Sequence, residues 1–439
     1  MCIRDRHGSL LAGLRLEAVA WDSEGLHLAA GEIYVAFELL PLVRRQLNID
    51  SLTVERLELE LGEIPEAEPK PQGEAFSLPL SIALRTSLLR NITVARGDLR
   101  RVIDSIATSG ELAGDTLRLT RLAVRSDWLD LDLSGTGQLA GNAPLDATAT
   151  WHWKEPDELA SRGRLEASGD LAAYTVRHEL DAPVSVTTTG SVAYTDAVLD
   201  VDLLNEWASL RWPLERGVLQ ASAGTLRLAG RPDRFVLDLD TGIRLDEGAE
   251  SRIRLSGDGR WTPEPQFDLD YAIAGFDPSL LDGRLRGALD SSGAAALAMR
   301  NDTFDLELGI ESLGGQLNGQ VVDGRATLTY ADGRTSIRDA ALRVGENSVT
   351  GSARFGDTLQ VDAEIDVVDL AGIVADAGGS VRGRVAVEGS LERPDVEVSL
   401  QGAGLAWQDY GVAKLAANAR LEGEQQGTAD VTIEGATIA

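Results

Sequence analysis

The side chains most often used in catalysis are scarce in this chain of 439 residues and follow no catalytic spacing. The four histidines, His7, His27, His152 and His178, lie far apart, and the one cysteine is Cys2. A zinc site needs His or Cys ligands at short separations, and many serine hydrolases carry a Gly-x-Ser-x-Gly turn. The sequence has neither pattern, so we expect no catalytic residues, no metal site and no enzymatic activity.

Carboxylate side chains are abundant, but their placement is typical of solvated strand faces. Asp and Glu number 70 against 41 Lys and Arg, which gives a formal net charge of −29. Pairs such as Asp130 with Asp132 and Asp238 with Asp240 alternate with apolar residues, whereas calcium loops have other spacings with glycine at fixed positions. Because nucleic-acid binding requires clustered Lys and Arg, the charge argues against a nucleic-acid partner.

Glycine-rich phrases recur without the surroundings of a phosphate-binding loop. The phrase Gly-x-[Leu/Val]-x-Gly occurs, for example, at 110–114 and 315–319. A nucleotide-binding loop stands between a strand and a long helix, but here strand patterns lie on both sides of the glycines. We therefore expect no nucleotide and no other cofactor.

Alternation of apolar and polar residues dominates the chain and predicts an all-β fold. Apolar side chains occupy every second position at 129–133, 267–273 and 304–310, which is the period of a half-buried strand. The 46 glycines and the aromatic content of 5% suit many short strands joined by tight turns. The apolar face of such a sheet must be hidden in a packed core or line a cavity that holds an apolar ligand.

Composition divides the chain into four segments. They are a non-native or unstructured start (1–13), an N-terminal β block with a short helix near 40–47 (14–61), a loop rich in Pro and Glu (62–81) and an elongated, repetitive β-sheet groove (82–439). Further helical turns are expected near 156–160, 278–281 and 369–375. No stretch approaches the roughly 20 apolar residues of a membrane-spanning helix.

Tryptophans cluster at the end of one predicted strand. Trp151 and Trp153 flank His152, and Trp207 and Trp212 frame a similar stretch. Such residues either form a sugar-stacking or interfacial patch or cap the end of a sheet, and we favour the cap.

Several stretches resemble a known family in their order along the chain. They are 14–21, 47–54, 57–59, 133–151, 212–230 and 389–400, the last opening with the phrase Gly-Ser-Leu-Glu-Arg-Pro. In this the chain resembles the TamB family, the translocation and assembly module proteins of the Gram-negative envelope, which belong with the AsmA-like proteins. None of the matching stretches is a catalytic motif.

The resemblance implies a shape, a location and partners. The shape is a long, twisted and curled antiparallel or mixed β-sheet, a trough or incompletely closed tube (β-taco-like) with a few short helical turns. The location is the periplasm, with an inner-membrane anchor in the full-length protein. The anchor helix and the conserved C-terminal domain, which meets an Omp85-type outer-membrane barrel protein, are not recognised here, so we expect an N-terminal or middle fragment.

Our leading hypothesis is a non-enzymatic periplasmic bridge whose hydrophobic groove carries phospholipid acyl chains between the inner and outer membranes. The candidate groove residues are alternating apolar side chains: Ile33, Val35, Phe37, Leu129, Leu131, Leu133, Phe267, Leu269, Tyr271, Ile273, Phe304, Leu306, Leu308, Ile310, Val361, Ile365, Val396, Val398 and Leu400.

Three other interpretations stay open at this point. The chain could be a scaffold for the assembly of outer-membrane β-barrel proteins or autotransporters, in which client strands pair with exposed edges. The apolar face could be the dry core of an ordinary sandwich. A glycan-processing or adhesive β-helix is disfavoured by the uneven spacing of the repeats. The inward face of each strand depends on register, because a slip of one residue inverts it.

Overall fold

A computed structural model describes most of the chain. The described residues are 2–9, 13–23, 25–62, 79–97, 99–154, 160–214, 217–246, 248–280, 285–300, 303–372, 377–390, 393–407, 410–422 and 426–438. The chain divides into two compact units, Met1–Asn205 and Glu206–Ala439.

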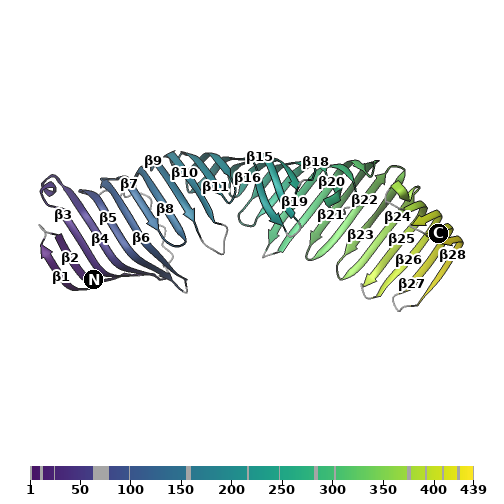
Figure 1. Cartoon of the computed structure of the whole chain (residues 1–439), viewed down its shortest axis with the longest axis horizontal. Helices are drawn as coiled ribbons and strands as arrows, with labels where there is room; N and C mark the ends of the chain where they lie inside the picture. Colours follow the sequence, from purple (N-terminus) through teal and green to yellow (C-terminus); the bar gives the residue numbers. More distant parts are fainter. Residues whose placement is uncertain are drawn as a thin grey trace. The chain divides into compact units, whose positions relative to one another are not determined.

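Unit 1 is built almost entirely of strands (Figure 1). They are β1 (Cys2–Ser9), β2 (Gly13–Ser23), β3 (Leu26–Glu38), β4 (Gln46–Leu61), β5 (Ser81–Arg96), β6 (Leu99–Ala113), β7 (Thr116–Arg125), β8 (Leu129–Gln138), β9 (Leu145–Trp153), β10 (Ser161–Asp170), β11 (Ala173–Ala182), β12 (Val186–Thr195) and β13 (Val198–Trp207). One short 3₁₀ helix, η1 (Leu40–Arg44), connects β3 to β4.

Unit 2 has the same construction. Its strands are β14 (Leu210–Leu214), β15 (Gly217–Arg231), β16 (Arg234–Leu245), β17 (Ser251–Arg260), β18 (Gln266–Phe276), β19 (Gly287–Arg300), β20 (Thr303–Leu317), β21 (Gln320–Ala331), β22 (Arg334–Val344), β23 (Asn347–Phe355), β24 (Thr358–Val367), β25 (Ala377–Ser390), β26 (Arg393–Trp407), β27 (Tyr410–Glu422) and β28 (Gln426–Ile438). Two 3₁₀ turns, η2 (Pro278–Leu280) and η3 (Leu370–Gly372), follow β18 and β24.

Strands that follow one another in the chain pair side by side. The strand pairs described in unit 2, from β14 to β28, are all antiparallel, as tight turns between alternating segments predict. Unit 1 has one exception, because β4 and β5 are parallel. A parallel pair needs a long connection, and residues 62–80 supply its length. The sheet of unit 1 is therefore mixed.

A line of backbone irregularities crosses the sheet of unit 1 from β2 to β5. Ala18, Arg56 and Asn91 have positive φ angles of 49°, 55° and 53°. All three lie at positions that the strand ladders skip: Ala18 between the pairs Glu17–Glu32 and Val19–Ala30, Arg56 between Glu32–Glu55 and Ala30–Leu57, and Asn91 between Glu55–Arg90 and Leu57–Ile92. Left-handed residues interrupt the pleat and bend a strand, so their alignment makes a crease across four strands.

The crease explains how a single layer of strands contains buried side chains. Val19, Leu57 and Ile92, each one residue beyond the line, are only 5%, 7% and 1% exposed. With Ala30 and Val54 they form the hydrophobic cluster of the unit, and no second sheet or long helix of the described residues covers them. Bending of the sheet over its own apolar face is therefore what buries them.

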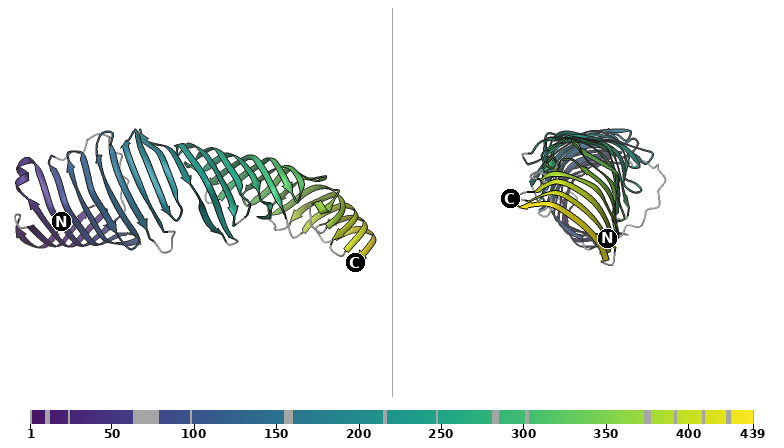
Figure 2. Two further views of the ribbon diagram at one scale, coloured as in Figure 1. Left: turned by 45° about the horizontal axis from the view of Figure 1, so that its top comes forward. Right: turned by 90° about the vertical axis from the view of Figure 1, so that its right-hand side faces the viewer.

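Unit 2 bends through aligned register shifts. The pairing shifts between Ile310 and Leu313 in β20, between Arg325 and Thr327 in β21, and between Ile337 and Ala340 in β22. Such bulges add local twist and curvature. The strands at the C-terminal end of the unit are drawn as arcs in the end-on view of Figure 2.

The predicted fold class is confirmed: strands with a few short 3₁₀ turns form a curled sheet in each unit, and no strand pairing among the described residues closes either unit into a barrel. The expected short helix near 40–47 is η1. The start differs from the unstructured alternative, because Cys2–Ser9 forms β1 and pairs with β2. Ladder hydrogen bonds to β2 order this segment despite its charged sequence. Most of the loop expected at 62–81, and the turn expected at 156–160, lie outside the described residues.

Truncation of Ile92 tests the packed crease. We expect Ile92→Ala to lower the free energy of unfolding of unit 1 by about 2–5 kcal/mol, because it opens a cavity in the cluster. Val102→Ala in the paired strand β6 is the control, since Val102 is 49% exposed and its loss should cost below about 0.5 kcal/mol. Urea unfolding followed by circular dichroism measures both, and equal losses would contradict a core at the crease.

Candidate functional site: the apolar face of the sheet

Cross-strand register aligns apolar side chains into rows on one face of each unit. Residues directly opposite each other in a β ladder project from the same face. In unit 1 an unbroken row of such partners runs from β2 to β9: Leu16, Ile33, Val54, Leu89, Ile106, Val124, Leu131 and Trp151. The parallel pair preserves the row, because Val54 in β4 stands opposite Leu89 in β5.

Two longer rows run through unit 2. The first spans β15 to β27 and consists of Leu228, Leu237, Gly257, Leu269, Ala295, Leu308, Leu328, Ile337, Ala353, Val361, Val387, Val396 and Leu421. The second spans β17 to β28 and consists of Ile253, Ile273, Ser291, Leu313, Gly324, Leu342, Val349, Ile365, Gly383, Leu400, Ala417 and Val431. With strands about 4.8 Å apart, the first row covers about 60 Å of sheet.

The nineteen residues singled out from the sequence lie on these apolar faces. In unit 1, Ile33 and Leu131 belong to the row above, and Val35, Phe37, Leu129 and Leu133 lie two residues or more along the same strand faces. In unit 2, members of the two rows are Leu269, Ile273, Leu308, Val361, Ile365, Val396 and Leu400. The remaining six alternate with them along the same strands: Phe267, Tyr271, Phe304, Leu306, Ile310 and Val398.

These side chains are incompletely covered. Apart from Tyr271, which is 9% exposed, and Phe304, which is 46% exposed, they are partly exposed. Ile33 differs in its surroundings, since it packs against the hydrophobic cluster at the crease. Among the described residues of both units, only eleven hydrophobic side chains are buried. A sandwich core would bury most of an apolar face of this size, so these faces are open to water over much of their length.

Hollows on the apolar face mark where neighbouring side chains leave room. One of about 290 Å³ in unit 1 lies between β7, β8 and β9, lined by residues such as Leu119, Leu133 and Ala147. Another of about 430 Å³ in unit 2 lies where Val381, Leu405 and Trp407 meet. Both are apolar and shallow, so they fit hydrocarbon rather than a polar ligand.

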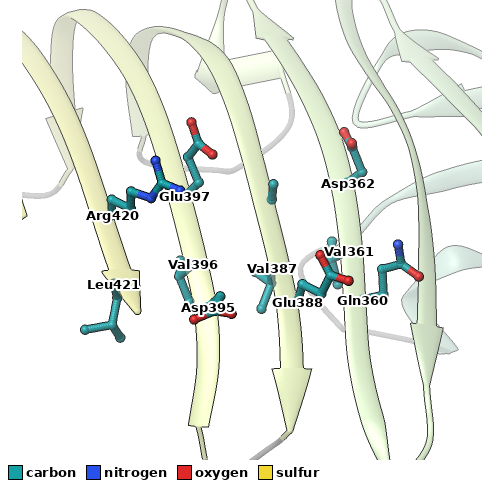
Figure 3. Close-up of a pocket in the computed structure, with 11 residues that line it drawn as sticks. Gln360, Val361, Asp362, Val387, Glu388, Asp395, Val396, Glu397, Arg420 and Leu421 are labelled. Atoms are coloured by element: carbon teal, nitrogen blue, oxygen red, sulfur yellow. The ribbon is translucent and has the colours of Figure 1, made fainter. Parts of the chain in front are cut away.

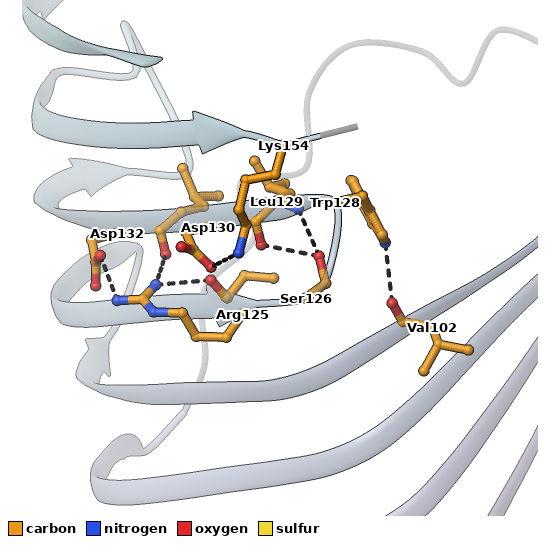
Figure 4. Close-up of polar contacts among 10 residues, drawn as sticks. Val102, Arg125, Ser126, Trp128, Leu129, Asp130, Asp132 and Lys154 are labelled. Carbon is orange, nitrogen blue, oxygen red and sulfur yellow. Dashed lines mark hydrogen bonds and ion pairs between the residues drawn. The ribbon is translucent and has the colours of Figure 1, made fainter. Parts of the chain in front are cut away.

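The opposite face carries ion pairs between neighbouring strands. Asp130 and Asp132, which alternate with the leucines of β8, bind Lys154 Nζ at 2.8 Å and Arg125 Nη2 at 2.6 Å (Figure 4). In unit 2, Arg252 Nε lies 2.5 Å from Asp240 Oδ1, and its hydrogen bond lowers the pKa of Asp240. These carboxylates are neutralised across strands, as expected for a solvated face rather than an ion site.

A hollow of about 440 Å³ on the ion-paired face of unit 2 has a different character. Figure 3 shows Asp362, Glu388 and Glu397 around it, with Arg420 from the next strand. Ala386 stands opposite Asp362 and Glu397, and its small side chain leaves the depression. Among the described residues, no group of three or more His, Cys, Asp or Glu side chains has a geometry that could hold a metal ion.

Polar side chains interrupt the apolar face of unit 1 at a place that sequence patterns did not reveal. His178 lies between Leu165 and Thr188 in a cross-strand row, and its ring stacks on Trp151 with centroids 5.1 Å apart. Thr188 donates a hydrogen bond of 2.7 Å to Asn205 Oδ1. Burial lowers the pKa of His178. The alternation of β11 placed His178 among Val176 and Leu180, but only the register shows its neighbours.

The tryptophans at the end of β9 pack against neighbouring side chains of the sheet and do not form a separate patch. Trp151 lies in the apolar row and stacks on His178, and Trp153 meets Trp128 edge to face at 5.3 Å. The indole Nε1 of Trp128 donates to the carbonyl of Val102 at 3.1 Å. These contacts join β9 to β11, and they join β6 and β9 to the turn between β7 and β8, which fits the sheet-capping interpretation.

Comparison with known proteins identifies the family to which the chain belongs. A family model for the N-terminal domain of TamB matches residues 1–120, 74–275 and 260–439, which together span the chain. The chain belongs to the TamB family. Three overlapping matches to one TamB model also agree with the repetition of one strand phrase. The resemblance noted from the sequence is thus confirmed.

One TamB relative is much longer than the part that this chain matches. The translocation and assembly module subunit TamB of Haemophilus influenzae is 24% identical over 358 residues, which cover 71% of this chain and 27% of the relative. The chain therefore spans about a quarter of the length of this TamB protein. Among the described residues, no helix has the length and apolarity needed to cross a bilayer.

The stack of His178 on Trp151 predicts a pH dependence. Because the folded-state pKa is lowered, the unfolded chain binds more protons below about pH 6.5, and stability is lost as pH falls through that window. We expect His178→Gln to lose less of its urea midpoint than the wild type between pH 7.5 and 5.5. His152→Gln, which changes an exposed histidine in β9, is the control and should follow the wild type. Identical profiles for all three proteins would contradict the prediction.

Proposed function

We propose that the apolar face of this chain is a groove for phospholipid acyl chains, and that the protein is a non-enzymatic periplasmic bridge for phospholipid transport between the inner and outer membranes. The observation that carries the proposal is the row from Leu228 to Leu421 in unit 2, which is apolar or glycine at every strand and stays partly exposed. A continuous apolar surface without a covering layer needs a ligand or partner to shield it from water.

Acyl chains suit this surface physically. Burial of each methylene contributes about 0.8 kcal/mol, so two chains lying along a row are held without any directional contact. Successive strands present similar aliphatic side chains. An acyl chain that moves along the row by one strand therefore exchanges one set of contacts for an equivalent set. Such a surface supports sliding, and the polar head group stays at the open edge of the trough, where water solvates it.

In this proposal the chain supplies a path for lipid and does not supply the energy for transport. The described residues hold no nucleotide-binding loop, and the glycine phrases stand between strands. We propose that the direction and the energy of transport come from the membranes or from other regions of a longer TamB protein. We include among these an inner-membrane anchor helix and a C-terminal region that contacts an Omp85-type outer-membrane barrel protein.

A second function has support from the relative, whose name describes a translocation and assembly module. In this alternative the chain is a scaffold for outer-membrane β-barrel proteins or autotransporters. Unfolded barrel strands alternate apolar and polar side chains, so the apolar side chains of a client strand would fit the apolar face of this sheet. The two functions share a surface and differ in the ligand.

A matched pair of substitutions in β24 tests the groove. Val361 and Gln360 are neighbours on opposite faces, and the side chain of Gln360 is exposed. We expect Val361→Asp to reduce co-purified phospholipid severalfold with an unchanged circular dichroism spectrum, because a carboxylate in the row is incompatible with acyl chains. Gln360→Asp should retain the wild-type lipid content. Loss of folding in Val361→Asp without any selective loss of lipid would indicate a dry core.

Photocrosslinking distinguishes the two ligands. A crosslinking amino acid at Leu328, in the middle of the row, is expected to form adducts with phospholipid in cells. The same amino acid at Thr329, on the opposite face, should form few. Adducts of Leu328 with barrel proteins in place of lipid would overturn the conduit in favour of the scaffold.

A further inference from the structure

The two most exposed large apolar side chains described in unit 1, Leu40 and Val43, lie in the short helix η1 together with the exposed Leu42. Leu40 is 88% exposed, Val43 is 89% exposed and Leu42 is 42% exposed. Figure 1 shows η1 as a coiled turn at the end of β3. None of the residues of η1 is buried. Single exposed leucines are common, but three within four residues form a patch that water disfavours.

The turn is held in this conformation by its own backbone. Pro41 stands in its first turn, and the amide of Arg45, a residue with φ of 60°, donates to the carbonyl of Leu42 at 2.9 Å. Ser81 then donates its amide to the carbonyl of Arg45 at 3.0 Å, which fixes the turn to the start of β5. The apolar side chains are therefore presented by a defined turn between two paired strands.

Positive charge lies directly beside the patch. Arg44 and Arg45 are exposed, and neither guanidinium is within ion-pair distance of a carboxylate among the described residues. The nearest acids along β3 and β4, Glu38 and Asp50, both contact Arg85 Nη1, at 2.9 and 3.1 Å. Two arginines thus remain available at this tip of a chain whose net charge is −29.

The pairing of exposed aliphatic groups with free arginines fits a phospholipid surface. Interfacial segments bury apolar side chains at the boundary between head groups and acyl chains, while Arg contacts phosphate. The large negative charge of the chain does not prevent this, because the Debye length of about 8 Å at physiological salt limits repulsion to charges close to the surface. A protein partner for this patch would need an apolar surface surrounded by acidic side chains. A phospholipid surface already provides both the apolar interior and, through its phosphates, the negative charge.

We propose that η1 is a membrane-docking tip: Leu40, Leu42 and Val43 insert into the interface of a bilayer that contains anionic phospholipid, and Arg44 and Arg45 bind its phosphates. The position suits the groove. Phe37 and Ile49, which pair on either side of η1, are the last partners of β3 and β4 on the apolar face, so a docked tip places the mouth of the groove at the bilayer. This link to lipid entry rests on the proposed function, whereas docking itself does not.

Vesicle binding by the full chain tests the tip. Vesicles of phosphatidylethanolamine and phosphatidylglycerol should sediment the wild-type chain, and vesicles of phosphatidylcholine alone should bind it less. We expect Leu40→Ser/Val43→Ser to bind at least about tenfold more weakly, because two buried aliphatic side chains are removed. Arg44→Gln/Arg45→Asn should bind about 25-fold more weakly to the anionic vesicles, at about fivefold for each arginine, and should lose the salt dependence. Val321→Ser is the control, since Val321 is an exposed valine (66%) in unit 2.

A local probe separates docking from other modes of binding. A polarity-sensitive dye on Val43→Cys, in a Cys2→Ser background, should shift to the blue with anionic vesicles, and the same dye at Val321→Cys should not. Val361→Asp should lose lipid from the groove and keep vesicle binding, so that the failure of one proposal is distinguishable from failure of the other. Absence of vesicle binding by the wild type, or equal binding by all variants, would overturn the membrane-docking tip.

Discussion

Cross-strand register is the constraint on which the rest of this structure depends. In a strand of alternating residues the apolar side chains project from one face. The register between neighbouring strands keeps these side chains on the same face of the sheet from strand to strand. The row from Leu228 to Leu421 passes through thirteen strands without a polar member. A shift of one residue at any ladder would turn the following strands over and place Asp, Glu and Arg in the row.

The same register leaves one apolar face of the sheet exposed to water. The described part of each unit has no second layer, so its apolar face is shielded only where the sheet bends. In unit 1 the left-handed residues Ala18, Arg56 and Asn91 produce that bend and bury Ile92 to 1% exposure. Elsewhere the face stays partly exposed. Stability and openness are thus divided: from Leu16 to Ile106 the row of unit 1 is packed into the cluster at the crease, whereas the rows of unit 2 stay partly exposed and available to a ligand.

The polar face makes this arrangement soluble. Ion pairs such as Arg382 with Asp366, at 2.6 Å, and Arg90 with Glu55, at 3.0 Å, join adjacent strands on the side away from the rows. Each is exposed and contributes little to stability alone. Their collective effect is to fix which face meets water, and charged side chains along strands also discourage pairing between separate sheets. The acidic excess seen in the composition therefore serves the exterior, with η1 as a local exception.

Local chemistry made much of this predictable from the sequence. The alternation at 267–273 and 304–310 determined strands, and the face shared by Leu269 and Leu308 follows once both strands are paired with β19 between them, where Ala295 stands opposite both leucines. The TamB resemblance was visible in the order of short phrases, and the family model confirms it. All of these are properties of residues within a few positions of one another.

Only the tertiary structure decided the features that depend on which strands and side chains become neighbours. The parallel pairing of β4 with β5, the crease at Asn91, the stack of Trp151 on His178 and the exposure of Leu40 and Val43 could not be read from a period of two. Alternation says that a side chain lies on one face of its own strand. Bulges, left-handed residues and the identity of the neighbouring strand determine which side chains that face then meets, because they change register over distances that local sequence does not encode.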